Sequence, residues 1–324
     1  NFRLLNDLMV HSLLRTVLNI SNTFAALLGS FPNLFVIYLC FSLPKGPLQG
    51  TRWSLSLQSA LEFINCLLLT GLQFALCEDV DQRLSILIIG YLSYSPVKVA
   101  ASIQALYTFF IVLSILTLPL AFIYRYSHIC RSRLKAVFRF HIIAAVISLL
   151  AMIDAAFILT IFPRLKYQKI TLNDTGLLNP DEKAIKVSFT KEAFCIVLAL
   201  CAFLIVVSII AYTIIAISTK RIVQTVRSGS ASNRMRVVQK QLTIAMVLQA
   251  MIPLTFTTLP LIAFIVLFFV VKIAAVEYAS LILALIHWQP CAHPALYLLF
   301  VRQFRRKLFV CNCSSSLFNS NVHS

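Results

Sequence analysis

The acidic residues of this chain avoid every second segment between its long apolar runs. Seventeen of the 28 Lys and Arg lie in or beside four of these segments, whereas none of the 11 Asp and Glu does. We predict seven membrane-spanning segments, at 17–41, 53–76, 98–126, 138–162, 190–218, 239–271 and 276–301. Basic residues near the ends of spans are retained on the cytoplasmic side. The alternation therefore predicts an N-terminus outside the cell and a tail inside.

The composition is that of a membrane protein. Hydrophobic residues make up 60% of the chain, charged residues make up 12%, and the mean hydropathy is +0.88. A span needs about 20 apolar residues to cross roughly 30 Å of hydrocarbon. We expect an extracellular segment at 1–16, one membrane domain at 17–301 and a cytoplasmic tail at 302–324. The expected fold is therefore an all-α, seven-helix bundle with the topology of a G-protein-coupled receptor.

The net charge of +17 does not indicate nucleic-acid binding, because the basic residues border spans and alternate in sidedness. Attraction to the anionic lipids of the inner leaflet explains them more simply. After the last span, Phe304 and Leu308 recur at helical spacing, and Arg305 and Arg306 can reach lipid headgroups. We therefore expect a short amphipathic helix from Arg302 to about Val310, lying along the inner membrane surface.

Three polar residues on different spans lie at the same depth. Asn33, Glu62 and His293 each stand eight or nine residues from the inner end of their span, which is roughly 12–14 Å at the rise of an α-helix. Polar groups are costly in lipid, so they face the bundle interior and find partners there. We expect one hydrogen-bonded network of the three. The alternative is that each is satisfied separately.

Arg125 ends the third span between Tyr124 and Tyr126. Its functional interpretation is a cytoplasmic contact that is covered at rest and meets a signalling partner when the sixth span swings outward. The plainer interpretation is an arginine that extends its charged group to the membrane surface.

Prolines near the inner halves of spans six and seven predict hinges. Pro253 should kink span six, because proline removes a backbone donor within a helix. Pro294 precedes Tyr297 by about one turn, so the tyrosine could change partners as the hinge moves. Lys240 lies on the basic inner part of span six. The alternative for span seven is a kinked helix with an aromatic anchor at the interface.

Candidate ligand-binding residues lie in the outer halves of spans three, five, six and seven. They are Gln104, Tyr107, Phe194, Phe264 and Tyr278. None of them is charged, which favours a small, uncharged and largely apolar ligand such as an odorant. Core packing or contact with lipid is the alternative for each.

Modification sites follow from sidedness. Asn173 begins an Asn-Asp-Thr sequon in the longest outer loop, where glycosylation can occur. Cys77 and Cys195 fall near the outer face, so the two residues could form a disulfide or remain free thiols. Cys311 and Cys313 follow a basic juxtamembrane stretch, which favours palmitoylation over plain exposed thiols.

Other function classes find little support. The sequence contains no GxxxxGK, HExxH, CxxC or GxSxG pattern, so we expect no enzyme, no metal centre and no cofactor. A transporter or channel subunit is the alternative to a receptor. It would need a water-lined path, and the intramembrane carboxyls Glu62 and Asp154 are too few and at different depths. A seven-span scaffold without a ligand is a third hypothesis.

The chain resembles nematode seven-transmembrane chemoreceptors of the str superfamily, and the str or srd class fits span six best. The resembling stretches are 42–53, 57–64, Phe122–Tyr126, Gln239–Leu242 with Leu248–Leu254, and Pro290–Arg306. The resemblance implies a chemosensory receptor for a small molecule that signals to a heterotrimeric G protein. It also implies a multi-pass protein of the plasma membrane, in the cilia of sensory neurons.

Two departures from rhodopsin-like receptors affect the expected switch. Tyr124 stands where those receptors carry an acidic residue, so no adjacent carboxylate can hold Arg125 at rest. His293 replaces the Asn or Asp that precedes the proline of span seven. Coupling to a G protein is therefore implied by likeness of fold alone.

Overall fold

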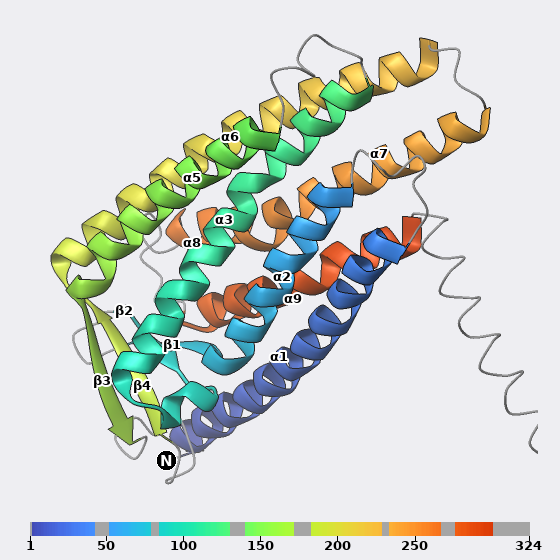
Figure 1. Ribbon diagram of the computed structural model, residues 1–324. Helices are drawn as coiled ribbons and strands as arrows, with labels where there is room; N and C mark the ends of the chain where they lie inside the picture. The colour runs from blue at the N-terminus through green and yellow to red at the C-terminus, as the bar shows by residue number, and fades with distance from the viewer. Residues whose placement is uncertain are drawn as a thin grey trace, which may run out of the picture.

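The computed structural model describes residues 2–42, 52–78, 84–129, 140–171, 183–228, 233–266 and 276–300. Within these ranges seven helical rods lie side by side, and a small sheet caps one end of them (Figure 1). The rods are α1 (Phe2–Ser42), α2 (Arg52–Leu72), α3 (Val97–Ile129), α5 (Phe140–Ile161), α6 (Lys191–Ser228), α7 (Asn233–Pro253) continued by η4 (Leu254–Thr258) and α8 (Leu259–Val266), and α9 (Val276–Phe300).

The helices differ from the predicted spans mainly at their ends. Helix α1 begins at Phe2, so most of the segment expected as an N-terminal tail is helical. Helix α6 continues to Ser228, ten residues beyond the predicted end of its span. Helix α2 ends at Leu72 instead of 76, because the chain turns there into a strand. Hydropathy detects the part of a helix that lies in lipid, whereas these extensions are polar or belong to the cap.

Four helices in the described part of the chain are long and apolar enough to cross a membrane. They cover Ile20–Ser42, Arg52–Leu72, Val97–Tyr124 and Ser208–Val226. On α1, Phe24, Phe31 and Tyr38 recur every seven residues and are 58%, 69% and 63% exposed. Large apolar side chains at this spacing form one outward stripe, which suits contact with lipid tails.

The sheet joins two segments that lie far apart in the sequence. Strands β1 (Phe74–Glu78) and β2 (Leu84–Ile88) connect α2 to α3, and β3 (Leu165–Thr171) and β4 (Lys183–Phe189) connect α5 to α6. All neighbouring strands are antiparallel, in the order β1-β2-β4-β3. Two short 3-10 turns, η1 (Tyr91–Tyr94) and η2 (Phe162–Arg164), link the sheet to α3 and α5. The sheet corrects the expectation of an all-α fold, because the pairing of strands from two distant connections leaves no local pattern in the sequence.

Alternating side chains explain how the sheet attaches to the bundle. Ile185 and Val187 on β4 are fully buried, and Ile88 on β2 pairs with Ile185 in register. Residues two apart on a strand share a face, so these side chains point together toward the helix ends. At the end of α2, Gln73 adopts φ of 39°, and its carbonyl accepts the Ile89 N–H at 3.0 Å. The turn thereby directs β1 back across the bundle.

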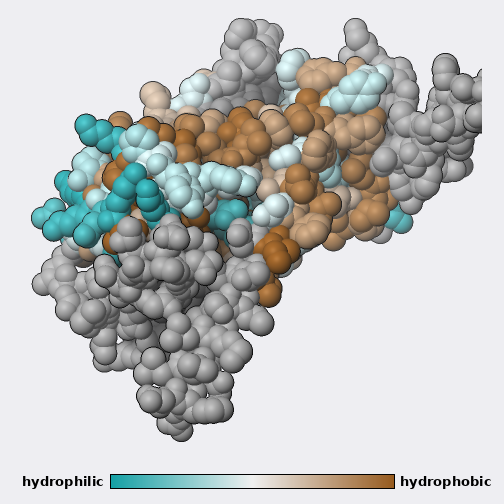
Figure 2. Space-filling view, turned by 90° about the horizontal axis from the view of Figure 1, so that it is seen from below, coloured by the Kyte–Doolittle hydropathy of each residue, from teal (hydrophilic) through white to brown (hydrophobic). Residues whose placement is uncertain are grey.

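The surface also differs between the end that carries the sheet and the middle of the bundle. Figure 2 shows hydrophilic side chains gathered at the end that carries the sheet and hydrophobic ones along the middle of the bundle. Inside, α3 packs against α2, α5 and α6, and α9 packs against α1, α2 and α7. Polar groups that face this interior can therefore meet from several helices.

Candidate functional site

A buried polar cluster joins α2, α3 and α9 in the middle of the bundle. The Glu62 carboxyl accepts hydrogen bonds through Oε1 from Ser114 Oγ at 2.6 Å and Gln58 Nε2 at 3.0 Å. Gln58 Nε2 also donates to Ser114 Oγ at 2.8 Å, and His293 Nε2 lies 3.4 Å from Glu62 Oε1. All four side chains are buried. We call these four residues the interior cluster.

Asn33 lies on α1 and makes other contacts. Its Nδ2 donates to the carbonyls of Gly29 at 2.8 Å and Pro290 at 2.9 Å. It thus joins α1 to the backbone of α9. The structure brings Glu62 and His293 together, as predicted from depth, while the bonds of Asn33 run to backbone instead of to those two side chains.

The sixth rod changes its helical geometry directly after Pro253. A π-helical turn, η4, occupies Leu254–Thr258, and α7 ends at the proline. Pro253 lacks the N–H that would continue the regular ladder, and π turns inside helices are frequent at functional sites. The local structure is therefore a hinge candidate where the sequence predicted a kink.

Three hydrogen bonds hold this hinge to its neighbours. The Tyr297 hydroxyl donates to Gln249 Oε1, and the Thr257 hydroxyl donates to Gln289 Oε1. On the other side, the Tyr212 hydroxyl of α6 donates to the Ala250 carbonyl at 3.0 Å. Tyr297 and Gln249 are both buried. We call the Tyr297–Gln249 contact the inner latch, because it ties α9 to α7 on the side of Pro253 that the charge pattern predicts to face the cytoplasm.

The end of α3 that lies away from the sheet carries the residues predicted to take part in coupling. Tyr124 and Tyr126 are half-buried there, and Arg125 lies between them on the helix, although its side chain is outside the described part. Lys240 on α7 is exposed, and Pro294 on α9 is buried. The tail from Arg302, with Cys311, Cys313 and the expected amphipathic helix, lies outside the described residues.

At the other end, two of the five predicted ligand residues lie under the sheet. Gln104 and Tyr107 on α3 are buried, and the Tyr107 ring lies 5.6 Å from that of Phe74 on β1. Gln104 Oε1 accepts a hydrogen bond from the Tyr167 hydroxyl of β3 at 3.2 Å. Burial raises the pKa of the Tyr167 phenol, which keeps it a neutral donor.

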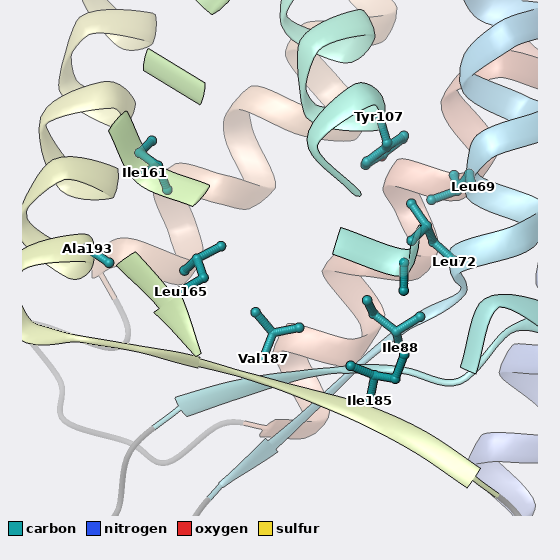
Figure 3. Close-up of a cluster of buried hydrophobic side chains, with 10 residues drawn as sticks. Leu69, Leu72, Ile88, Tyr107, Ile161, Leu165, Ile185, Val187 and Ala193 are labelled. Carbon is teal, nitrogen blue, oxygen red and sulfur yellow. The ribbon is translucent and has the colours of Figure 1, made fainter. Parts of the chain in front are cut away.

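An apolar cluster fills the space around these two residues. Figure 3 shows Tyr107, Leu69 and Leu72 from the helices meeting Ile88, Ile185 and Val187 from the sheet. Phe194, Phe264 and Tyr278 lie on α6, α8 and α9, but their side chains are outside the described part. Only two of the five predicted residues can therefore be placed, and both lie under the sheet. We call the strands and this cluster the outer cap.

Of the two alternatives for Cys77 and Cys195, the disulfide is not formed. Cys195 is a free, exposed thiol in α6. Cys77 lies on β1, which pairs with β2, and β2 separates it from β4 and the start of α6. Sidedness alone could not reveal this, because both residues do belong to the same end of the bundle. Asn173 lies outside the described residues.

Several contributors to the site had no assigned role in the sequence analysis. They are Gln58, Ser114, Gln249, Thr257 and Gln289. Their common signal is an uncharged polar side chain inside an apolar span, and Gln58 also precedes Glu62 by one helical turn. Within the described residues, no three His, Cys, Asp or Glu side chains gather as metal ligands would.

Comparison with known protein families identifies the family of this chain. The family model of the serpentine-type seven-transmembrane GPCR chemoreceptors Srd matches residues 18–310. The chain belongs to the Srd family of chemoreceptors. No curated protein matches it significantly. The match begins at residue 18, within α1, and extends beyond the end of α9, so the chain is a multi-pass membrane protein of a receptor family. The resemblance to the str superfamily, with srd among the best-fitting classes, is confirmed.

Proposed function

We propose that this Srd-family chain binds a small external molecule with a largely apolar skeleton under the outer cap and activates a heterotrimeric G protein at the inner end. The observation that carries the proposal is the π turn after Pro253. The Thr257 hydroxyl of this turn donates to Gln289 of α9, and just before the turn Gln249 accepts a hydrogen bond from Tyr297 of α9. A helix with a local hinge and few, directed contacts can adopt two discrete arrangements. Receptors need such an element.

The ligand end is supported by the chemistry of the outer cap. Gln104 and Tyr107 are surrounded by aliphatic and aromatic groups, and Tyr167 gives one polar contact. Small-molecule sites combine a mostly apolar lining with a few polar groups that fix orientation. A ligand that repacks this cluster would act directly on α3, which contacts α2, α5 and α6.

The G-protein end is supported by charge. The inner ends of α6 and α7 carry Lys220, Arg221, Arg234, Arg236 and Lys240, and no acidic residue lies between 219 and 240. Such a surface attracts a partner with exposed carboxylates. We propose that α7 moves about the hinge when the inner latch opens. A ligand that binds the open form better would shift the population toward it.

The orientation in the membrane belongs to the same proposal. The sheet joins the two connections that the charge pattern places outside, and α1 begins at this end of the bundle (Figure 1). We propose an outside N-terminus, an inside tail and residence in the plasma membrane of sensory cilia. Epitope tags before Phe2 and after the tail should be detected on intact and on permeabilised cells, respectively. The reverse pattern would contradict this orientation.

The coupling test uses Arg125. In cells that express the receptor, G-protein recruitment would be recorded against a panel of volatile alcohols, ketones, esters and amines. Arg125→Ala should keep surface expression but lose most ligand-evoked recruitment. The matched control is Lys98→Ala, which removes an exposed cation from the opposite end of the same helix. Undiminished recruitment by Arg125→Ala would show that Arg125 only anchors α3 in the membrane. Ligand-evoked ion flux without recruitment would favour the transporter or channel alternative.

A further inference from the structure

A buried carboxyl group outside the interior cluster has no hydrogen-bond partner among the described residues. Asp154 of α5 is 2% exposed, and neither of its carboxyl oxygens has a hydrogen-bond partner in the structure. In contrast, Oε1 of Glu62 accepts two hydrogen bonds. An unsatisfied carboxyl within a membrane domain is costly, and ionisable residues there are usually functional. Asp154 therefore needs a partner that the described chain does not supply.

The carboxyl of Asp154 faces the bundle and not the lipid. Asp154 shares its buried face with Ile158 and Ile161, at the three-to-four-residue spacing of a helix. The opposite face is lipid-exposed, since Met152 and Leu159 are 63% and 73% exposed. Helix α5 packs mainly against α3, with a smaller contact to α6. Association with a second receptor through α5 would therefore not satisfy this group.

Asp154 also lies below the outer cap. Ile161 belongs to the apolar cluster under the sheet, and Asp154 is seven residues, or about 10 Å, farther from the sheet along α5. Between them, Phe157 contacts Phe203 of α6, with ring centroids 5.5 Å apart. Phe157 is three residues from Asp154, so the two side chains are neighbours on the helix surface. An aromatic pair thus lies between the carboxyl and the cap.

A carboxylate beside aromatic rings is the chemistry that recognises an ammonium group. The carboxylate supplies the opposite charge and two acceptor oxygens, and the ring faces attract a cation. A neutral alcohol would bring one donor and no charge. The sequence-based expectation of an uncharged ligand considered five uncharged residues and did not include Asp154.

We propose that the ligand of this receptor is a small amine, whose ammonium group binds Asp154 and whose apolar skeleton packs against Phe157, Phe203 and the outer cap. The inference rests on the proposed function, because it names the class of ligand for the same outer region. It assigns to α5 the residue that decides between amines and neutral odorants.

The test measures binding without signalling. Purified receptor in lipid nanodiscs would be heated with straight-chain, branched, cyclic and aromatic primary amines, each paired with the alcohol of the same skeleton. At least one amine should raise Tm saturably, with an apparent Kd at least about tenfold below that of its alcohol. Asp154→Asn should remove this advantage. Glu192→Gln, which removes an 81% exposed carboxylate at the start of α6, should keep it.

Two outcomes of this binding test overturn the proposal. One is that no amine binds better than its paired alcohol. The other is that the advantage survives in Asp154→Asn. Binding of an amine without G-protein recruitment would leave this inference standing and contradict the proposed coupling. Recruitment of the G protein by neutral odorants alone would contradict this inference and leave the proposed coupling standing.

Ligand-free stability gives an independent measurement. If Asp154 is unpartnered until a ligand arrives, Asp154→Asn and Asp154→Leu should unfold at the same temperature as the wild type or higher. A group that had a structural partner would instead lower Tm when removed. A clear fall in the Tm of both variants would therefore also overturn the proposal.

Discussion

The interior cluster and the outer cap hold helices together by different means. In the interior cluster, Glu62, Ser114 and Gln58 are joined by hydrogen bonds of 2.6 to 3.0 Å between side chains of two helices, and His293 of a third lies 3.4 Å from Glu62. In the outer cap, aliphatic side chains from the sheet pack on the ends of α2 and α3, and Gln104–Tyr167 adds one polar contact.

The difference matches the two tasks of a receptor. Hydrogen bonds are directional, so a network of them favours a few discrete arrangements and suits a switch. Apolar packing is non-directional and can be rearranged around ligands of similar volume. At one point, however, the cap meets the end of α2 through a close backbone contact between Gly90 and Gly71. An added methyl group should be tolerated less well there than in the interior of the bundle.

The largest expected effect tests that closure. Gly90→Ala would place a Cβ 2.3 Å from the Gly71 carbonyl oxygen and 2.9 Å from its carbon. These are backbone atoms that cannot rotate away, so we expect a loss of about 3 kcal/mol or more in the free energy of unfolding. Surface expression should fall severely, and Tm of any purified protein should drop. Near-normal expression would mean that the contact between Gly71 and Gly90 is loose.

The second prediction concerns the acceptor of the interior cluster. Glu62→Ala leaves the buried Ser114 hydroxyl without its acceptor and takes one from Gln58, at a cost of about 2–3 kcal/mol. Glu62→Gln keeps an oxygen there and should cost clearly less. Thermal unfolding of both variants checks this. Equal losses would show that volume, and not hydrogen bonding, determines stability at this position.

A glycine in the interior allows a matched comparison with Gly90. In Gly29→Ala the new Cβ would lie 2.7 Å from Cys66 Sγ, a side-chain atom that can move. We expect a loss of about 1–2 kcal/mol. Because Cys66→Ala removes the opposing sulfur, the double variant should recover much of that loss. Additive losses in a double-mutant cycle would instead locate the strain elsewhere.

The smallest expected effect on stability comes from the inner latch. Tyr297→Phe removes the hydroxyl that donates to Gln249 and should cost about 0.6–1 kcal/mol. If the latch is made only at rest, the active population should rise about three- to fivefold and raise ligand-independent G-protein recruitment. Tyr167→Phe removes a comparable hydroxyl from the cap and should leave that basal signal unchanged. Equal basal signals in both variants would contradict a role for the latch.

Much of the membrane domain was predictable because hydrophobicity and charge act locally. The positions of the rods followed from apolar runs of span length, and the hinge followed from Pro253 because proline lacks an N–H wherever it stands in a helix. The depth argument also placed Glu62 beside His293, since rise per residue is nearly constant in a helix.

The contact partners of individual side chains could not be predicted from the sequence in the same way. Asn33 has the same depth as Glu62, yet it bonds to the Pro290 carbonyl, because rotation about the helix axis and not depth determines what it meets. Gln249 lay in a recognised stretch of span six, but only the packing of α7 against α9 shows that it accepts the Tyr297 hydrogen bond.

The sequence by itself determined the number of rods and the membrane environment, because each span must satisfy its own backbone hydrogen bonds in lipid regardless of its neighbours. It also carried the family membership. The tertiary structure alone decided the sheet, whose central strands β2 and β4 pair residues about 100 positions apart in the sequence, such as Ile88 with Ile185. It alone showed that Asp154 is buried without a hydrogen-bond partner among the described residues. Long-range pairing and helix rotation depend on which surfaces meet, and no local pattern encodes that.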